Sequence, residues 1–549
     1  MAHDDDNTED LQVLAATATE KAEEMVRRAD QLMAEFQQLN DLRQARGLVP
    51  VAAGQRSLRQ VAGSEHAIFH KHLQDLQGSA DDDDDARKAD LVKRLGVSLR
   101  CSNLPALEAT WGVVKRCRGL ESLVFAFSRH PAFGACSICK RPPPRGPPDG
   151  GAVTGTKPRR KKCPPKNRQD PADLARVDAV VEGGTEWVRV LGISERSLLM
   201  HMAQGGWDWG AEEGEREREE EEDDDADCDV SVAVTVRQLV EAARANRHDY
   251  RVPRVHVVLT RVAEGRDAEI DRLIRLLRRG AGAGAGAEVE VVVDCAGSAF
   301  LAAPPPPADE ALRNLTDDGR LWGLTPTVNL DCTVLVTLAS DVTHGRVEVR
   351  PWHSRETARQ VVDELEQGST LVRFLYPALR GRRLVCTRAA ARRFGEIVDT
   401  IATPTEAARA AIIMGNPLSG PSGMSSPALV AELQTLSEHT VDPDLLFPIE
   451  VVDAKSPADD IESYIRSGRL PQVAAPVLAE MSELNRDSHL YGWVQGVTTV
   501  TANLSLAKQI ARLVEEHRTS DDEAGPKVWV HPVTRALAAK EKRIDEATP

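Results

Sequence analysis

The sequence of 549 residues has few aromatic side chains and no long apolar run. Aromatic residues make up 4% of the chain, hydrophobic residues 41% and charged residues 28%, a composition typical of a globular protein that folds in water. No stretch of about 18 consecutive apolar residues occurs, which is the length that a transmembrane helix needs. We therefore expect no segment that crosses a membrane. The length exceeds that of a single core and predicts two or three domains.

A secretory signal is also missing from the start of the sequence. The first residues, Met-Ala-His-Asp-Asp-Asp, are acidic and lack the basic start and apolar core of a signal peptide. The nine cysteines are scattered over the whole length, so we expect reduced thiols and no disulfide framework. These absences predict a cytoplasmic or nuclear protein. No motif of a sequence-specific DNA-binding protein is evident either.

The net charge of -16 comes from two short acidic runs. Residues 212–229 hold 13 acids and two arginines, and residues 81–85 are five aspartates. These runs account for the whole net charge, so the rest of the chain is neutral. Both runs carry too much like charge to fold, and we expect solvated loops. The overall acidity therefore neither supports nor excludes an RNA partner.

Changes in composition divide the chain into five segments. The first has apolar residues at helical steps of three and four, with a break near Gly54, and predicts a helical hairpin followed by shorter helices. The second is rich in proline and basic residues, which cannot build a core, so we expect disorder. The segments are residues 1–135 (helical region), 136–173 (disordered insert), 174–300 (small α/β region with an acidic loop at 211–229), 301–320 (linker) and 321–549 (C-terminal domain).

The third and fifth segments alternate between strands and helices. Val177–Val181 and Trp187–Val190 flank a glycine pair and predict a hairpin. Residues 254–294 contain a strand, an amphipathic helix and a second strand, which predict a βαβ unit. The fifth segment repeats short strands between helices, which is typical of a three-layer α/β domain with a parallel sheet. Its expected strands are Val328–Asp331, Arg383–Cys386, Ile449–Val452, Thr498–Thr501 and Val528–His531.

Asp331 is the most informative residue of this pattern. It ends a predicted buried strand and precedes a helix that begins at Cys332, so its carboxylate lies at the edge where parallel sheets bind ligands. An alternative is that Asp331 only caps this helix, because Asp is a favoured N-cap. Carboxylates gathered at one site need a cation, and oxygen ligands favour Mg²⁺ or Mn²⁺. Such a site can activate water against a phosphodiester.

Two further elements carry polar groups that can converge on Asp331. Glu396 and Asp399 lie three residues apart on one face of a predicted helix, although the same spacing fits a solvent-exposed face. Thr501 and Asn503 follow a strand and begin a helix. A helix N-terminus with hydroxyl groups suits a phosphate or a metal-bound water, while the alternative is an N-cap pair.

A separate metal site is suggested by Cys136 and Cys139. Their spacing is that of half a structural zinc site, with Cys163 and His130 as candidates for the remaining ligands. A full site normally contains a second close pair, which this segment lacks.

Several blocks of the chain resemble a known but uncharacterised eukaryotic family, domain of unknown function 1308 (DUF1308). The resemblance covers roughly residues 10 to 545, with the charged and proline-rich runs as insertions. It rests on ordered blocks and names no activity. The blocks are Gly183–Val190, Thr327–Leu335, Phe394–Thr400, Val500–Asn503 and Val528–Leu537.

The second half of that family is similar to the PIN-like nuclease fold, a parallel sheet whose strand ends carry acids for a divalent metal. The resemblance gives Asp331 the place of the first acid, and it matches Thr501 and Asn503 to a late Thr-Asn segment near the metal. Where relatives have acids in the second helix, this chain has Arg388 and Arg393. Losing acids and gaining arginines weakens metal binding, because each carboxylate supplies both charge and a ligand.

One hypothesis is therefore a metal-dependent ribonuclease. Asp331 is the metal ligand and principal catalytic residue, Glu396 or Asp399 assists, and Thr501 and Asn503 position phosphate or water. The cofactor is Mg²⁺ or Mn²⁺.

The second hypothesis is a catalytically degenerate adaptor or RNA-associated binding protein. Arg388 and Arg393 replace the charge of the metal and bind a phosphate or a carboxylate directly. The N-terminal helices supply a surface for a partner, which is RNA or another protein. The replaced acids favour this second hypothesis.

Overall fold

A computed structural model of the chain shows two compact units. One unit comprises Met1–His248 and Val252–Asp317, and the other Asp249–Arg251 and Asp318–Pro549. The predicted insert, the two candidate zinc cysteines and nearly all of the acidic loop lie outside the described residues. The structure describes residues 2–46, 48, 52–78, 85–129, 173–209, 229–279, 289–345, 347–416, 423–452 and 461–539.

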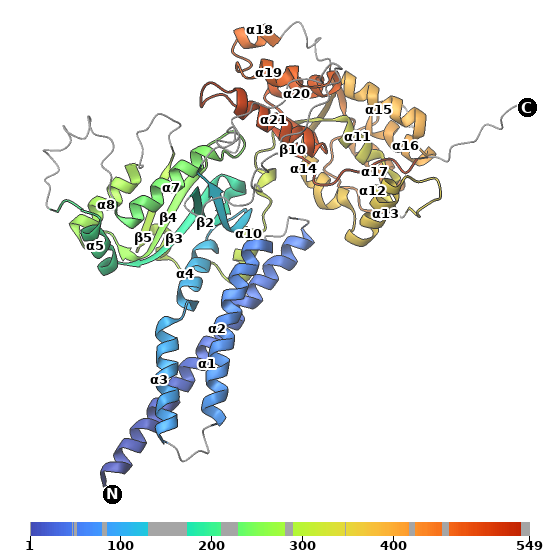
Figure 1. The fold of residues 1–549 in the computed structure, drawn as a ribbon. Coiled ribbons are helices and arrows are strands. Elements are labelled where there is room, and N and C mark those ends of the chain that lie inside the picture. The colour runs from blue at the N-terminus through green and yellow to red at the C-terminus, as the bar shows by residue number, and fades with distance from the viewer. Residues whose placement is uncertain are drawn as a thin grey trace, which may run out of the picture. The chain divides into compact units, whose positions relative to one another are not determined.

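The N-terminal unit begins with the predicted helical hairpin, drawn in blue in Figure 1. The two long helices run antiparallel, because Arg59 donates to Gln37 at 2.9 Å while His66 lies 3.4 Å from Asp30. One stripe of the first helix is buried, including Phe36 and Leu39, as the steps of three and four predict. The helices are α1 (Ala2–Ala45), α2 (Ala52–Gly78), α3 (Asp85–Cys101) and α4 (Leu104–Val114).

A five-stranded sheet completes the same unit, with the strand order β1-β2-β3-β4-β5. β1, β2 and β3 are antiparallel, and β3, β4 and β5 are parallel. The predicted hairpin (β2 and β3) and βαβ unit (β4, α8 and β5) are both present. The elements are β1 (Ser122–Ser128), β2 (Leu174–Val181), η2 (Glu182–Gly184), β3 (Glu186–Ser194), α5 (Glu195–Gln204), α7 (Ser231–Ala245), β4 (Arg254–Ala263), α8 (Ala268–Arg279) and β5 (Val291–Ala296).

Two parts of this unit differ from the sequence-based expectation. β1 lies in the segment expected to be helical; only its Leu123 is buried, so the strand leaves almost no alternating pattern. The expected linker 301–320 contains α10 (Ala308–Leu315), which follows α9 (Ala299–Ala302) and precedes η3 (Gly319–Leu321). α10 packs into the unit through three buried apolar residues, but its eight residues are too short for a clear periodicity.

The C-terminal unit contains the predicted parallel sheet, covered by helices. All five strands are parallel, in the order β10-β9-β6-β7-β8. The strands are β6 (Thr327–Leu330), β7 (Arg383–Thr387), β8 (Glu450–Val452), β9 (Thr498–Thr501) and β10 (Val528–Val530). The helices are α11 (Cys332–Ala339), α12 (Asp341–His344), α13 (Arg355–Gln367), η4 (Leu371–Leu375), α14 (Tyr376–Leu379), α15 (Arg388–Ile401), α16 (Pro404–Ile413), α17 (Ser426–Thr435), α18 (Ile461–Arg466), α19 (Ala474–Ala479), α20 (Glu483–Gln495) and α21 (Leu504–His517).

The strand order makes β6 the central strand of this sheet. The chain leaves β6 for β7 and β8 on one side, and then returns to form β9 on the other side. β6 and β9 therefore flank the point where the direction of strand addition reverses, which is where open α/β sheets bind ligands beyond the strand ends. Val328 and Leu330 are fully buried in the apolar core, so the alternating residues Asn329 and Asp331 face the other side of the sheet.

The sequence predicts one helix over Val473–Asn485, whereas the structure has two, α19 and α20. The chain leaves α19 at Glu480, and Ser482 takes the extended N-cap conformation of α20. α20 then continues to Gln495, well beyond the expected end. None of the helices that the structure describes combines the length and apolar character needed to cross a membrane.

Candidate functional site

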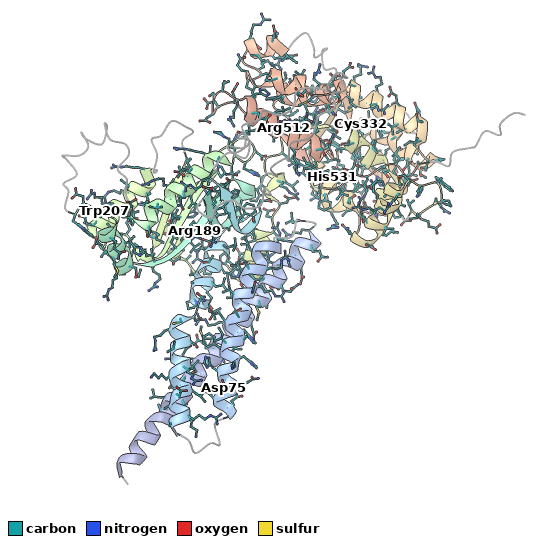
Figure 2. All side chains as sticks on the ribbon, viewed as in Figure 1. Asp75, Arg189, Trp207, Cys332, Arg512 and His531 are labelled. Carbon is teal, nitrogen blue, oxygen red and sulfur yellow. The ribbon has the colours of Figure 1, made fainter. Side chains whose placement is uncertain are left out.

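Asp331 lies directly after β6, and its side chain is buried with 3% exposure. Its Oδ1 accepts a hydrogen bond from the backbone N–H of Cys332 at 2.7 Å. Its Oδ2 accepts from the hydroxyls of Thr333 and Thr501, both at 2.9 Å. Three donors of the protein thus hold the carboxylate in place. Figure 2 marks Cys332, the neighbour of Asp331, in the C-terminal unit.

These bonds connect the two strands at which the sheet order reverses. Thr333 belongs to α11 after β6, and Thr501 ends β9. The hydroxyl of Thr333 also accepts from the backbone N–H of Ala502 at 3.0 Å, and that of Thr501 accepts from the backbone N–H of Asn503 at 3.0 Å. The hydroxyls therefore form a continuous network with the Asp331 carboxylate. Its immediate effect is to join the two strand ends.

Asn503 has the geometry of a helix cap. Its Oδ1 accepts from the backbone N–H of Leu506 at 3.1 Å, and Asn503 is the N-cap of α21. Thr501 differs, because its side chain is fully buried and donates to Asp331. Of Thr501 and Asn503, only Thr501 forms a side-chain hydrogen bond with Asp331.

Glu396 and Asp399 lie on the solvent-exposed face of α15. Glu396 accepts from Arg393 at 3.0 Å, and both side chains are more than half exposed. The structure therefore brings Asp331 and Thr501 into contact, while Glu396 and Asp399 lie exposed on α15. Among the described residues, no group of three or more His, Cys, Asp and Glu side chains is arranged to hold a metal ion.

The predicted arginines lie at the start of α15, which follows β7. Arg388, Arg392 and Arg393 are all exposed, and the first turn of the helix contains no acid. Thr387 caps this helix, accepting from the backbone N–H of Ala390 at 3.3 Å. Because β6 and β7 are parallel neighbours, α15 begins at the same edge of the sheet as Asp331. The arginines therefore follow β7, which lies beside β6, and Asp331 lies at the end of β6.

Two thiols lie near this edge but are not suited to nucleophilic chemistry. Burial raises the pKa of Cys332 to about 12; the carboxylate of Asp331 adds to this, and Arg393 opposes it. Burial also raises the pKa of Cys386 to about 12. Both are therefore protonated at neutral pH, and the thiolate is the nucleophilic form.

Polar groups from α20 also lie close to β6, and no sequence pattern points to them. Ser488 and His489 are buried, as is Asn329 on β6. The Asn329 amide donates to the carbonyl of Ser488 at 2.9 Å and to the hydroxyl of Thr499 at 3.1 Å. In the described part of the chain, the Ser488 hydroxyl, both ring nitrogens of His489 and the Asn329 carbonyl have no hydrogen-bond partner.

The imidazole of His489 is held neutral at this position. Burial lowers its pKa, and the carboxylate of Asp331 opposes that effect without cancelling it. The alternation of Asn329 and Asp331 in a strand of apolar residues is a signal that identifies the polar face of β6. No comparable signal exists for His489, because the helix that carries it extends past the predicted boundary.

Residues 328–421 match the model of a family described as Protein of unknown function (DUF1308). This segment is similar to that family. The matching segment begins within β6 and contains Asp331 and all of α15. β9 and α20 lie outside it, so the carboxylate network joins a residue of the matching segment to later parts of the chain. No curated protein and no solved structure matches the chain.

Proposed function

We propose that the C-terminal unit is a non-catalytic RNA-binding domain, related in fold to PIN-like nucleases, which acts as an adaptor. The observation that carries this proposal is the carboxylate of Asp331, which is buried and accepts from three donors of the protein itself. A carboxylate has about four acceptor positions, so little capacity is left for a metal. The other predicted acids, Glu396 and Asp399, are exposed on α15 and do not complete a metal site.

The exposed arginines at the start of α15 supply the binding surface. A helix N-terminus attracts anions, and guanidinium groups bind phosphate through paired hydrogen bonds. Arg388 and Arg392 are four residues apart and thus lie on one side of the helix. The resemblance to PIN-like nucleases favours single-stranded RNA as the anionic partner. A protein partner is the competing outcome.

A reducing compartment, the cytoplasm or the nucleus, is part of this proposal. It is supported by the cysteines of the described residues, which all carry free thiols. These cysteines are Cys101, Cys117, Cys295, Cys332 and Cys386.

Binding of the full chain to a short single-stranded RNA, measured by fluorescence anisotropy over a range of salt concentrations, tests the proposal. Changing Arg388, Arg392 and Arg393 together to Gln should weaken binding and lower the slope of log K against log salt by about 3, one for each lost phosphate contact. The matched control is a triple Gln variant of Arg350, Arg355 and Arg359, exposed arginines elsewhere in the same unit. Equal weakening by both triple variants, or no RNA binding by the unaltered chain, would contradict the proposal.

The ribonuclease is the second candidate, favoured by the position of Asp331 where the strand order reverses. It requires Mn²⁺ binding that depends on Asp331, together with RNA cleavage. Calorimetric titration with Mn²⁺ and a cleavage assay on the unaltered chain and Asp331→Asn decide between the two. Cleavage by the unaltered chain that Asp331→Asn abolishes, with both proteins folded by circular dichroism, would replace the adaptor proposal.

A further inference from the structure

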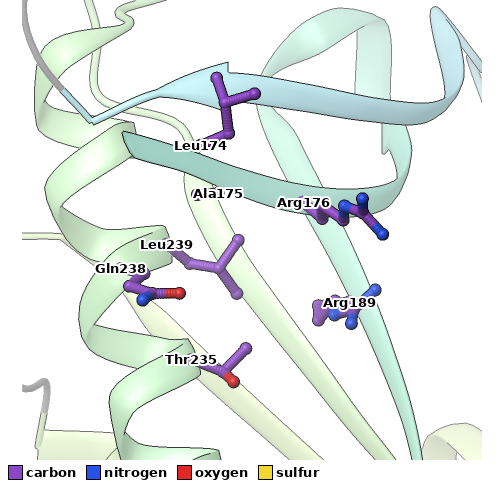
Figure 3. Close-up of a pocket in the computed structure, with 7 residues that line it drawn as sticks. All are labelled: Leu174, Ala175, Arg176, Arg189, Thr235, Gln238 and Leu239. Atoms are coloured by element: carbon purple, nitrogen blue, oxygen red, sulfur yellow. The ribbon is translucent and has the colours of Figure 1, made fainter. Parts of the chain in front are cut away.

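A pocket in the N-terminal unit has features of a separate ligand site. It opens between the strands β2 and β3 and the helix α7, and its volume is about 160 Å³. Figure 3 shows two arginines on the strand side and polar side chains of α7 facing them. The lining residues are Leu174, Ala175, Arg176, Arg189, Thr235, Gln238 and Leu239.

The two arginines differ in the hydrogen bonds and ion pairs that the protein provides for them. Arg189 is paired with Asp178, whose two carboxylate oxygens lie 3.1 and 3.2 Å from Nη1. The Nε of Arg189 is buried and has no hydrogen-bond partner in the described residues. Arg176 is exposed and forms no ion pair within that part of the chain. The pocket therefore offers one unused buried donor and one uncompensated positive charge.

The composition of the pocket selects the chemistry of its ligand. A buried guanidinium N–H without an acceptor is unfavourable, so an acceptor supplied from outside stabilises it. Two arginines and one paired aspartate leave a single positive charge, which matches a monoanion. Thr235 and Gln238 add a hydroxyl and an amide, while the leucines form an apolar wall.

We infer that this pocket binds a carboxylate group on a short apolar stem, held between the guanidiniums of Arg176 and Arg189. The planar fork of a guanidinium fits a carboxylate through paired hydrogen bonds. The group comes either from a small organic acid or from the C-terminus of a peptide, and both present the same chemistry. A phosphate dianion carries more charge than the pocket compensates.

Isothermal titration of the full chain with butyrate measures this binding directly. We expect saturable binding of butyrate, weaker binding of phosphate, and none of butyramide, which has the same shape without the charge. Arg176→Gln should weaken butyrate binding at least tenfold. Arg196→Gln, an exposed arginine of α5 outside the pocket, should leave it unchanged.

A second variant covers the case in which loss of charge disturbs the fold. Arg189→Lys keeps a cation beside Asp178 but removes the Nε donor, so it should weaken butyrate binding while the melting temperature stays close to that of the unaltered chain. A short peptide with a free C-terminus, compared with its amidated form, then separates the two sources. Equal affinity in Arg176→Gln, Arg189→Lys and the control, or tighter binding of phosphate than of butyrate, would overturn the inference.

Discussion

Individual polar residues in the C-terminal unit are buried at a cost that their hydrogen bonds must offset. A buried carboxylate without hydrogen-bond donors is strongly unfavourable. Asp331 has three such donors, which come from the ends of β6 and β9. Thr501 is the donor that comes from the other strand, β9. Its hydroxyl also accepts from the backbone N–H of Asn503, so one side chain serves both partners.

Replacing Thr501 by Val keeps the shape of the side chain and removes this hydroxyl. Asp331 then loses a donor in the interior, and the free energy of unfolding should fall by about 2 kcal/mol. Urea denaturation measures the change. Thr400→Val on the exposed face of α15 is the control, with an expected change within about 0.5 kcal/mol. A Thr501→Val protein as stable as the control would show that the network does not stabilise the sheet.

Two buried histidines make the stability of the same unit depend on pH. Burial lowers the pKa of His344 to about 3 and that of His531 to about 4. In the unfolded chain the pKa is about 6.5, so the unfolded state takes up protons first as the pH falls. Stability is therefore full above about pH 6.5 and decreases toward pH 4, with each ring removing about 2 kcal/mol at pH 5.

Urea midpoints at pH 7.5 and pH 5 measure this decrease. Changing both His344 and His531 to Gln, which does not titrate, should reduce the difference between the two midpoints. An unchanged difference in the double variant would assign the pH dependence to other groups.

At the scale of elements, hydrogen-bonded caps set the positions of the helices around the parallel sheet. α16 begins with a capping box formed by Thr403 and Glu406. Asp341, the first residue of α12, accepts from Thr403 and Thr405 at 2.5 and 2.6 Å and from Arg409 at 2.6 Å. Burial opposes ionisation of Asp341, but these three hydrogen bonds together lower its pKa. α12 and α16 are thus fixed to each other by one carboxylate.

Asp341→Asn should loosen this junction by removing the charge that faces Arg409. The Arg409 side chain is only 5% exposed, so its cation would remain buried without a counter-ion. We expect a loss of about 3 kcal/mol in the free energy of unfolding, measured by urea denaturation. Asp444→Asn, at an exposed ion pair of the same unit, should change it by less than about 1 kcal/mol. Similar losses in both variants would reject a special role for Asp341.

The sequence predicts those elements whose ends carry local signals. The sequence predicts helices over Arg355–Gln367 and Glu406–Met414, and α13 and α16 lie within two residues of these bounds. Each begins at a Ser or Thr cap that precedes an apolar stripe. β1 and α10 were missed, since one has a single buried residue and the other is very short. Strand ends on one sheet predict that Asp331 and Thr501 lie close together, and their side chains form a hydrogen bond. The exposure of Glu396 and Asp399 shows that shared helical spacing does not identify which face is buried.

At the scale of the whole molecule, the two units are not simple halves of the chain. Residues Asp249–Arg251 group with the C-terminal unit, although the residues on both sides of them belong to the N-terminal unit. Tyr250 packs against the apolar cluster that contains Leu470 and Ile510. A side chain at Gly525 would overlap the Tyr250 ring and displace it. A boundary drawn only at residue 317 would therefore remove part of the C-terminal core.

Tyr250→Ala tests this assignment in the full chain. It should lower the hydrogen-exchange protection of α21 and β10 and leave that of β4, in the N-terminal unit, unchanged. The ring is partly buried, and its loss should cost about 2 kcal/mol. Arg251→Ala, an exposed neighbour, is the control. A loss of protection in β4 with none in α21 would assign Tyr250 to the other unit.

The position of β9 beside β6 has a consequence for how the protein is made. The hydrogen bond from Thr501 to Asp331 joins residues 170 positions apart. A ribosome adds about 5 to 20 residues per second, so β6 emerges about 10 to 30 seconds before its neighbour β9. During that interval one edge of the nascent sheet is unpaired and the aspartate lacks its hydroxyl donor. Such an edge attracts other strands, and premature termination before β9 would yield a product prone to aggregation.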